Sequence, residues 1–287
     1  MNIALLLSIT LLLISPNYSQ SENIDFNSPA NIRLFADYLY CDQDYLRAIF
    51  EYDRLLEFAM NDTLRFKIGL CYSYMHDYLS STNNFDLILP SSPLYNQSKI
   101  EWLKAIFLLG DYPGFRVSYQ NQFASDINKY QNEGKKLFNF TYLFTDDPLP
   151  SKEEFLLPFA LSEKEELSKF YNWKHDPPYK NSTLAGIMSA IIPGSGKAYV
   201  GDTSDGIVAF LVTGILVFLA YDNFQADHLT RAWIFTGLAG LFYGGNIYGS
   251  IASAQIHNAK ITFEFNESLH IYLQKNNYYS PTYDFCK

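Results

Sequence analysis

The spacing of apolar residues predicts helices over the first half of the chain. Between residues 29 and 58, apolar side chains recur every three or four positions, beginning with Ile32, Phe35 and Leu39. This period places them on one face of an α-helix. The polar stretch 41–44 interrupts the pattern. The sequence therefore predicts two short helices whose apolar faces pack against each other.

The same pattern recurs 33 residues later and, less regularly, a third time. The equivalent positions are Ala36, Tyr45 and Ala48, then Gly69, Tyr78 and Ser81, then Gly110 and Tyr112. Over residues 29 to 125 the sequence resembles the tetratricopeptide repeat family, whose unit of about 34 residues is a helix–turn–helix with small residues where the helices cross. The resemblance implies a short helical solenoid, expected over residues 29–145, whose concave surface binds peptides or proteins.

The composition changes beyond residue 181, where charged side chains become rare. Residues 206–221 and 232–251 carry no charge at all, and a ten-residue polar connection separates them. The second stretch is long enough to cross a bilayer and the first is close to the minimum. Tyr221 and Trp233 lie at their edges, where amphipathic rings favour the headgroup level. The pattern predicts a transmembrane helical hairpin, with a buried hairpin of a soluble protein as the alternative.

A glycine-rich stretch, AIIPGSGKAYVGDTSDG at 190–206, precedes the hairpin. It is no phosphate-binding loop, because Lys197 is followed by Ala198 instead of a serine or threonine. It also lacks the third glycine of a dinucleotide fingerprint, whose position holds Tyr199. Proline and glycine instead predict a break in an apolar helix. We expect this break near the membrane surface, where Lys197 reaches the headgroups and Tyr199 is an anchor.

The broken helix and hairpin also resemble a known kind of bacterial membrane domain. Its pattern is P-G-x-G-x-x-Y-x-G before two apolar helices, with a small or polar start to the next helix. The matching residues are Pro193, Gly194, Gly196, Tyr199, Gly201, Asp205 and Gly206. The resemblance covers residues 183–257. It implies an integral membrane module of envelope proteins, sometimes joined to tetratricopeptide repeats, and no particular reaction.

Glycines in the second apolar stretch indicate close helix packing. Gly240 with Gly244, and Gly245 with Gly249, have the G-x-x-x-G spacing that lets helices approach in lipid. We expect the first helix of the hairpin to be the partner, and self-association of two copies is the alternative. Asn246 in the same stretch is expected to hydrogen-bond to another helix, since an unpaired amide is unfavourable in hydrocarbon.

The remaining segments give weaker signals. Residues 1–19 have the short apolar core of a secretory signal peptide, with an uncleaved anchor as the alternative. Prolines divide residues 146–182 into a predicted linker with one short helix, in which Asp146 and Asp147 are expected to be solvated. The tail 258–287 begins with a strand-like alternation at 261–265, and the pattern assigns it no role.

Charge and cysteine content exclude several classes of protein. A net charge of −9 without any basic run argues against nucleic-acid binding. Cys41, Cys71 and Cys286 are too few for a disulfide-built scaffold. Buried thiols are expected, and pairing of Cys41 with Cys71 stays open. Because the histidines form no metal or catalytic motif, we expect neither enzyme activity nor a cofactor.

Together these features predict an all-α protein, a repeat solenoid followed by a transmembrane hairpin. The predicted location is a bacterial inner membrane, with the repeats in the periplasm. The expected role is a scaffold or adaptor that binds protein partners. Membrane transport or protein insertion through the glycine-rich hairpin is the alternative. The sequence leaves open whether the chain crosses the membrane two or three times.

Overall fold

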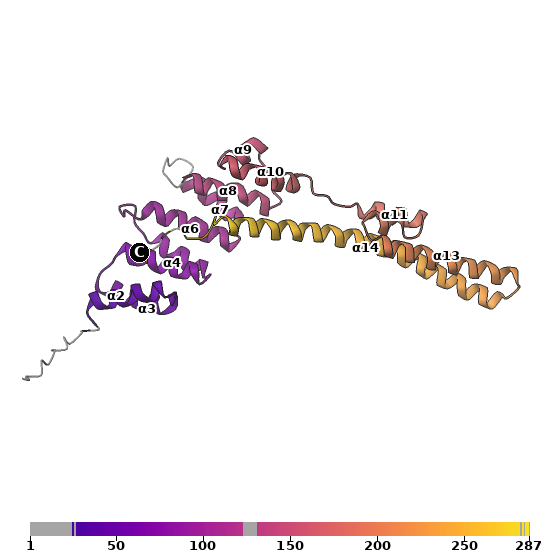
Figure 1. Ribbon diagram of the computed structural model, residues 1–287, viewed down its shortest axis with the longest axis horizontal. Helices are drawn as coiled ribbons and strands as arrows, with labels where there is room; N and C mark the ends of the chain where they lie inside the picture. Colours follow the sequence, from indigo (N-terminus) through magenta and orange to yellow (C-terminus); the bar gives the residue numbers. More distant parts are fainter. Residues whose placement is uncertain (1–24, 26, 123–130, 282, 284, 287) are drawn as a thin grey trace, which may run out of the picture. The chain divides into compact units, whose positions relative to one another are not determined.

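The chain is built from helices, as the apolar spacing predicts. The computed structural model describes residues 25, 27–122, 131–281, 283, 285 and 286, and these contain α-helices and no strand. The helices, shown in Figure 1, are α2 (Pro29–Cys41), α3 (Tyr45–Phe58), α4 (Asp62–Tyr74), α5 (Tyr78–Asp86), α6 (Tyr95–Leu109), α7 (Tyr112–Gln122), α8 (Gln131–Phe144), α9 (Lys152–Leu156), α10 (Leu161–His175), α11 (Ser182–Ile191), α12 (Ser195–Tyr199), α13 (Thr203–Gln225) and α14 (Leu229–Lys275). The signal peptide expected at 1–19 lies outside the described residues.

Two compact units make up the chain. The first combines residues 1–99 with 281–287, and the second spans 100–280. In the first unit α2 packs on α3, α3 on α4, and α4 on α5. The helix starts have polar caps, since Asp44 accepts a hydrogen bond from the Arg47 N–H and Asp77 accepts one from the Ser80 N–H. These caps fix the turns between the paired helices.

Small residues lie where the paired helices of the first unit meet. Ala36 and Ala48 are fully buried. A Cβ atom at Gly69 would lie 2.7 Å from the Phe85 ring, and the Ser81 hydroxyl donates to the Gly69 carbonyl oxygen over 2.9 Å. Larger side chains at these positions would separate the helices. The equivalent positions noted in the sequence therefore take part in close helix contacts in both pairs.

The second unit has an aromatic core to which segments distant in sequence contribute. Helices α6 to α10 surround it, and the last turns of α14 add Phe265, Leu269 and Leu273. All three side chains are buried. The strand-like alternation at 261–265 was therefore misleading, because these residues belong to α14. Burial of the Phe265–Leu273 face outweighs the β propensity of this short stretch.

The predicted linker also differs from the structure. Residues 146–182 contain two complete helices, α9 and α10, together with the start of α11. Phe155 of α9 and Leu167 of α10 are fully buried in the same core. The prolines at 148, 150 and 158 bound the helices instead of marking an unstructured connection. This segment is thus part of the second unit's core.

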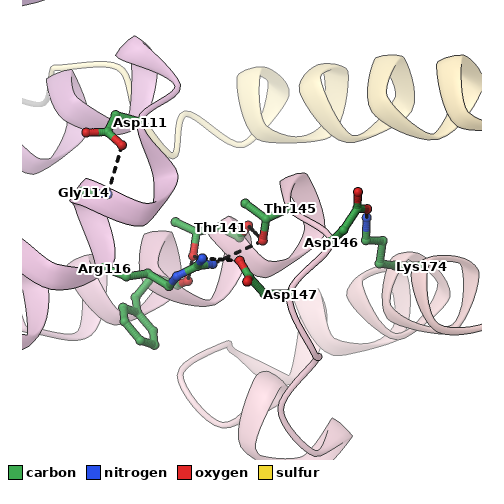
Figure 2. Close-up of polar contacts among 9 residues, drawn as sticks. Asp111, Gly114, Arg116, Thr141, Thr145, Asp146, Asp147 and Lys174 are labelled. Carbon is green, nitrogen blue, oxygen red and sulfur yellow. Dashed lines mark hydrogen bonds and ion pairs between the residues drawn. The ribbon is translucent and has the colours of Figure 1, made fainter.

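Ion pairs attach the segment after α8 to its neighbours (Figure 2). Arg116 of α7 donates to the hydroxyls of Thr141 and Thr145, each over 3.3 Å, and forms an ion pair with Asp147. Hydrogen bonds from Thr145 and Arg116 lower the pKa of Asp147. Asp146 is paired with Lys174 at 3.4 Å. Although both carboxylates are exposed, as expected, they form specific ion pairs.

The segment that follows α14 is held by Glu163 of α10. Its carboxylate accepts hydrogen bonds from the Tyr278 hydroxyl and from the Ala160 N–H, and it is paired with Lys136 at 3.0 Å. Burial alone would raise the pKa of Glu163, but these hydrogen bonds and the Lys136 charge outweigh it and lower the pKa. The ionised carboxylate therefore holds Tyr278, in the segment after α14, against α10.

Candidate functional site

The apolar hairpin is formed by α13 and the first half of α14, which pack against each other and run side by side in Figure 1. The three residues 226–228 connect them. Among the described residues, α13 is the one helix long and apolar enough to cross a membrane by length and composition, and only 17% of its most apolar window is buried. Large apolar side chains such as Phe210, Ile215 and Phe218 are more than half exposed. The helical hairpin is thus present, with an apolar outer surface.

The predicted break in the apolar helix is confirmed at Pro193. Helix α11 ends at Ile191, and Gly194 adopts a left-handed conformation with φ 85° before the short helix α12. A Cβ atom on Gly194 would lie well under 3.0 Å from the Gly206 carbonyl oxygen. One on Gly196 would lie equally close to the Ala185 carbonyl oxygen. The glycines of the motif therefore allow backbone segments to cross.

We call this crossing the hairpin junction, comprising α11, α12, the first turn of α13 and the facing turns of α14. A buried polar link holds it together. The Ser189 and Ser250 hydroxyls are 2.7 Å apart, and Ser189 also accepts from the Gly196 N–H over 2.9 Å. Ser250 in addition donates to the Asn246 carbonyl oxygen. These bonds join α11, α12 and α14 at one point.

Lys197 and Tyr199 lie at the outer side of the hairpin junction. The Lys197 ammonium is 3.8 Å from the Asp205 carboxylate, and Asp205 is largely exposed. The Tyr199 hydroxyl accepts from the Asn181 N–H over 3.3 Å, and the Lys180 ammonium lies 4.9 Å from the Tyr199 ring centroid. Tyr199 therefore connects the junction to the segment before α11, and Lys197 connects α12 to α13. Gly201, with φ 102°, ends the turn after α12.

A cavity of about 520 Å³ opens beside the junction between α13 and α14. Lys197, Asp205, Thr213 and Asn246 are the polar residues in its otherwise apolar lining. Asn246 is only 6% exposed, and neither polar atom of its side chain has a hydrogen-bond partner among the described residues. The expectation that its amide bonds to another helix is therefore wrong. Ser189 and Ser250 supply the polar link between helices instead.

The G-x-x-x-G glycines do not mediate packing inside the hairpin. A Cβ atom at Gly240, Gly244 or Gly245 would meet no atom within 4 Å, and one at Gly249 would meet only the Lys197 side chain. The expected self-packing through these residues is therefore wrong. The buried positions are Ala220 of α13 and Ala232 and Ala239 of α14, together with Thr213, Asn246, Ser250 and Gly206. Alanine at these contacts already allows a close approach.

In the first unit, the C-terminal segment contacts α2 and α4. We call the surface formed by Asp37, Tyr40, Cys41, Phe66 and Lys67 the tail-binding face. The ring centroid of Tyr283 lies 5.1 Å from that of Phe66, and the Phe285 ring is 6.2 Å from both Phe66 and Tyr40. Of the tail 258–287, to which the sequence assigned no role, residues 281–287 are therefore part of the first unit, whereas 258–280 belong to the second. From here on, the tail means residues 281–287.

The cysteines are arranged differently from the expectation of buried thiols. Cys41 forms a disulfide with Cys286, closing a sequence separation of 245 residues. The expectation of a buried thiol holds for Cys71 alone, which is fully buried and unpaired. Burial raises the pKa of the Cys71 thiol to about 12, so it stays protonated and unreactive at neutral pH. The spacing of cysteines could not reveal a partner so distant in sequence.

The aromatic repeat positions have well-defined partners. Tyr45 is stacked on Tyr74 with ring centroids 4.9 Å apart, and the Tyr78 hydroxyl lies 2.7 Å from His76 Nδ1. In the second unit, Tyr112 follows Gly110, whose φ is 78°, and is stacked on Phe144. These rings fill the spaces between helices, and none of them lines the tail-binding face.

No cluster of three or more His, Cys, Asp or Glu side chains that could hold a metal occurs in the described part of the chain. Comparisons with family models, with curated proteins and with solved structures find no match. Functional inference therefore depends on the two sites described above, the hairpin junction with its cavity and the tail-binding face.

Proposed function

We propose that the protein is a membrane-tethered scaffold or adaptor of a bacterial inner membrane. In this proposal the α13–α14 hairpin crosses the bilayer and the helix pairs recognise protein partners. The observation that carries it is the exposed apolar surface of α13, of which only 17% of the most apolar window is buried. A soluble protein would leave this surface in contact with water, which is unfavourable for so large an apolar patch.

The dimensions of the hairpin support two crossings. Helix α13 has 23 residues, or about 35 Å at 1.5 Å per residue, close to the thickness of a bilayer core. On α14, exposed large apolar side chains extend from Trp233 to Ile256, about 35 Å of helix. Because a hairpin returns the chain to its starting side, both α11 and the end of α14 belong on the same side of the membrane in this proposal.

The disulfide supports a periplasmic location for the helical units. Cys41 and Cys286 are both exposed to solvent, so a reducing cytoplasm would open their bond, whereas an oxidising compartment preserves it. The continuous helix α14 also supports the role of a tether, because it joins the hairpin to the aromatic core of the second unit. Its 47 residues span about 70 Å, and its last turns are buried in the core of the second unit. A rigid helix would hold this aromatic core at a defined distance from the membrane.

The adaptor role can be tested with a photoreactive amino acid on the face proposed to bind partners. Arg33 is exposed and lies one helical turn before Asp37, on the same side of α2. With the photoreactive residue at this position, irradiation of intact cells is expected to give a discrete crosslinked protein. The matched control is Leu79 on α5, which is 63% exposed. Identical crosslinks from both positions, or none from Arg33, would contradict the adaptor role.

Transport or insertion through the hairpin is a second candidate, which the cavity with the unpartnered Asn246 favours. An apolar protein interior rarely keeps an unpaired amide, because it costs about 1–3 kcal/mol. Under this second reading, Asn246→Leu would abolish cellular function while leaving the protein folded and in the membrane. Under the adaptor proposal, the same substitution leaves function intact and stabilises the hairpin.

A further inference from the structure

The last residues of the chain lie on the tail-binding face in the manner of a bound peptide. Tyr283 and Phe285 are two positions apart in the sequence, and their ring centroids are 5.4 Å apart. Both rings contact Phe66, which is fully buried. The face therefore accommodates two aromatic side chains in an aromatic-x-aromatic arrangement.

A fixed positive charge belongs to the same face. Lys67 is only 5% exposed, and its ammonium is held 2.6 Å from the Asp37 carboxylate. The Tyr52 hydroxyl donates to the same Asp37 oxygen over 2.7 Å. So positioned, the ammonium lies 4.7 Å from the Phe285 ring centroid, within the range of a cation–π contact. The face is thus preorganised to receive an aromatic ring at this position.

The Cys41–Cys286 disulfide keeps the tail in place. It joins α2 to the residue next to Phe285, and both cysteines are exposed. Two half-buried rings alone make a weak interaction, whereas a covalent link gives the tail a very high local concentration at the face. An external segment cannot compete while the link is closed. Because both cysteine residues are exposed, a reducing dithiol can approach the bond.

We propose that the tail is a built-in ligand of the tail-binding face and that the Cys41–Cys286 disulfide is a redox latch that controls its release. A dithiol reductant, a small molecule or a thioredoxin-like protein, attacks one sulfur through its thiolate and forms a mixed disulfide. Its second thiol resolves this intermediate. The reductant leaves as a disulfide, and two electrons and two protons convert Cys41 and Cys286 to thiols.

The external ligand is an extended peptide segment of a partner protein with two aromatic side chains separated by one residue. This identification rests on the proposed adaptor function, because it names the partner of that same face. The tail remains a competitor after reduction, at a local concentration on the order of millimolar for a flexible tether. Only segments that bind more tightly than the tail, or that are themselves concentrated at the membrane, displace it.

The test measures the binding of a fluorescein-labelled peptide that copies residues 281–287 with Cys286→Ser. Fluorescence anisotropy compares three forms of the full chain in detergent: the oxidised protein, the protein reduced with dithiothreitol, and a variant with Cys286→Ser, Tyr283→Ala and Phe285→Ala. We expect no binding to the oxidised form, weak binding to the reduced form, and binding at least about tenfold tighter to the variant, which lacks the competing rings. A control peptide with both aromatic residues changed to alanine should not bind.

Equal binding to the oxidised protein and the variant would overturn the proposal, as would no binding to a variant whose circular dichroism matches that of the wild type. Should the variant not fold, Cys286→Ser alone decides the matter. Its Cys41 should be alkylated rapidly and its α2 and α4 amides should exchange faster than in the oxidised protein, and unchanged rates of both would overturn the latch. Disulfide-linked dimers of the wild-type protein on a non-reducing gel would mean that two copies exchange tails, which would also contradict the latch.

Crosslinking from Arg33 in cells is an independent measurement. If that crosslink forms but the peptide does not bind, the latch is refuted and the adaptor function is retained.

Discussion

Gly196→Ala is expected to disrupt the hairpin junction and to destabilise it by more than about 3 kcal/mol. The new Cβ atom would lie well under 3.0 Å from the Ala185 carbonyl oxygen, which is a backbone atom and cannot rotate away. Separating α12 from α11 would also break the 2.9 Å hydrogen bond from the Gly196 N–H to Ser189. Limited trypsin digestion reports the effect, because cleavage after Lys197 should become rapid in the variant.

Gly244→Ala is the matched control for this prediction. It makes the same chemical change in α14, where the added Cβ atom meets nothing within 4 Å. Alanine favours helix over glycine by about 1 kcal/mol, so this variant should be as resistant to trypsin as the wild type, or more so. If both variants are equally resistant, the crossing of α11 and α12 is not as tight as described. If Gly244→Ala is instead the sensitive one, the glycine face of α14 has a packing partner.

Lys67→Ala is expected to destabilise the first unit by about 3 kcal/mol. The substitution removes a buried ammonium from Asp37 and from the rings of Tyr52 and Phe285. It also leaves a space where the side-chain stem was packed. Asp37 is about one-third exposed and keeps the Tyr52 hydroxyl, so its carboxylate is only partly deprived of partners. Hydrogen–deuterium exchange of the α2 and α4 amides measures the loss as a lower free energy of opening.

One variant separates charge from packing at Lys67, and a second is a control for loss of an exposed ion pair. Lys67→Met keeps the length of the side chain and should lose only about 1–2 kcal/mol. Lys169→Ala removes a lysine whose ion pair with Glu165 has both side chains exposed. It should change the free energy of opening of the α2 and α4 amides by less than about 0.5 kcal/mol. An effect of Lys67→Ala no larger than that of Lys169→Ala would mean that the buried pair does not hold the tail-binding face together.

Local signals in the sequence were enough to predict much of the helical structure. The three- and four-residue spacing of Ile32, Phe35 and Leu39 follows directly from helix geometry, and α2 includes all three residues. Pro193 and Gly194 act on their own backbone, so the break before α12 could be located from two residues. These features depend only on residues that are close together in the sequence, so they can be predicted from the sequence alone.

Contacts between distant segments could not be predicted in the same way. Nothing near Cys286 indicates that Cys41 lies beside it. The spacing of Gly240 and Gly244 shows that one face of α14 lacks side chains, but not that this face makes no contact with α13. Phe265 lies in a stretch with β propensity, and only its burial against the core of the second unit selects the helix. In each case the deciding partner is distant in sequence.

Membrane insertion of the hairpin is tested most directly by the accessibility of single cysteines to a membrane-impermeable maleimide. The native protein provides a low background, because Cys41 and Cys286 are bonded and Cys71 is buried. Lys180→Cys, Ile215→Cys and Asp227→Cys place the probe before α11, within α13 and at the tip of the hairpin. A two-crossing hairpin predicts that positions 180 and 227 are labelled from opposite sides of the membrane and that position 215 is labelled from neither. Labelling of all three positions from one side would contradict it.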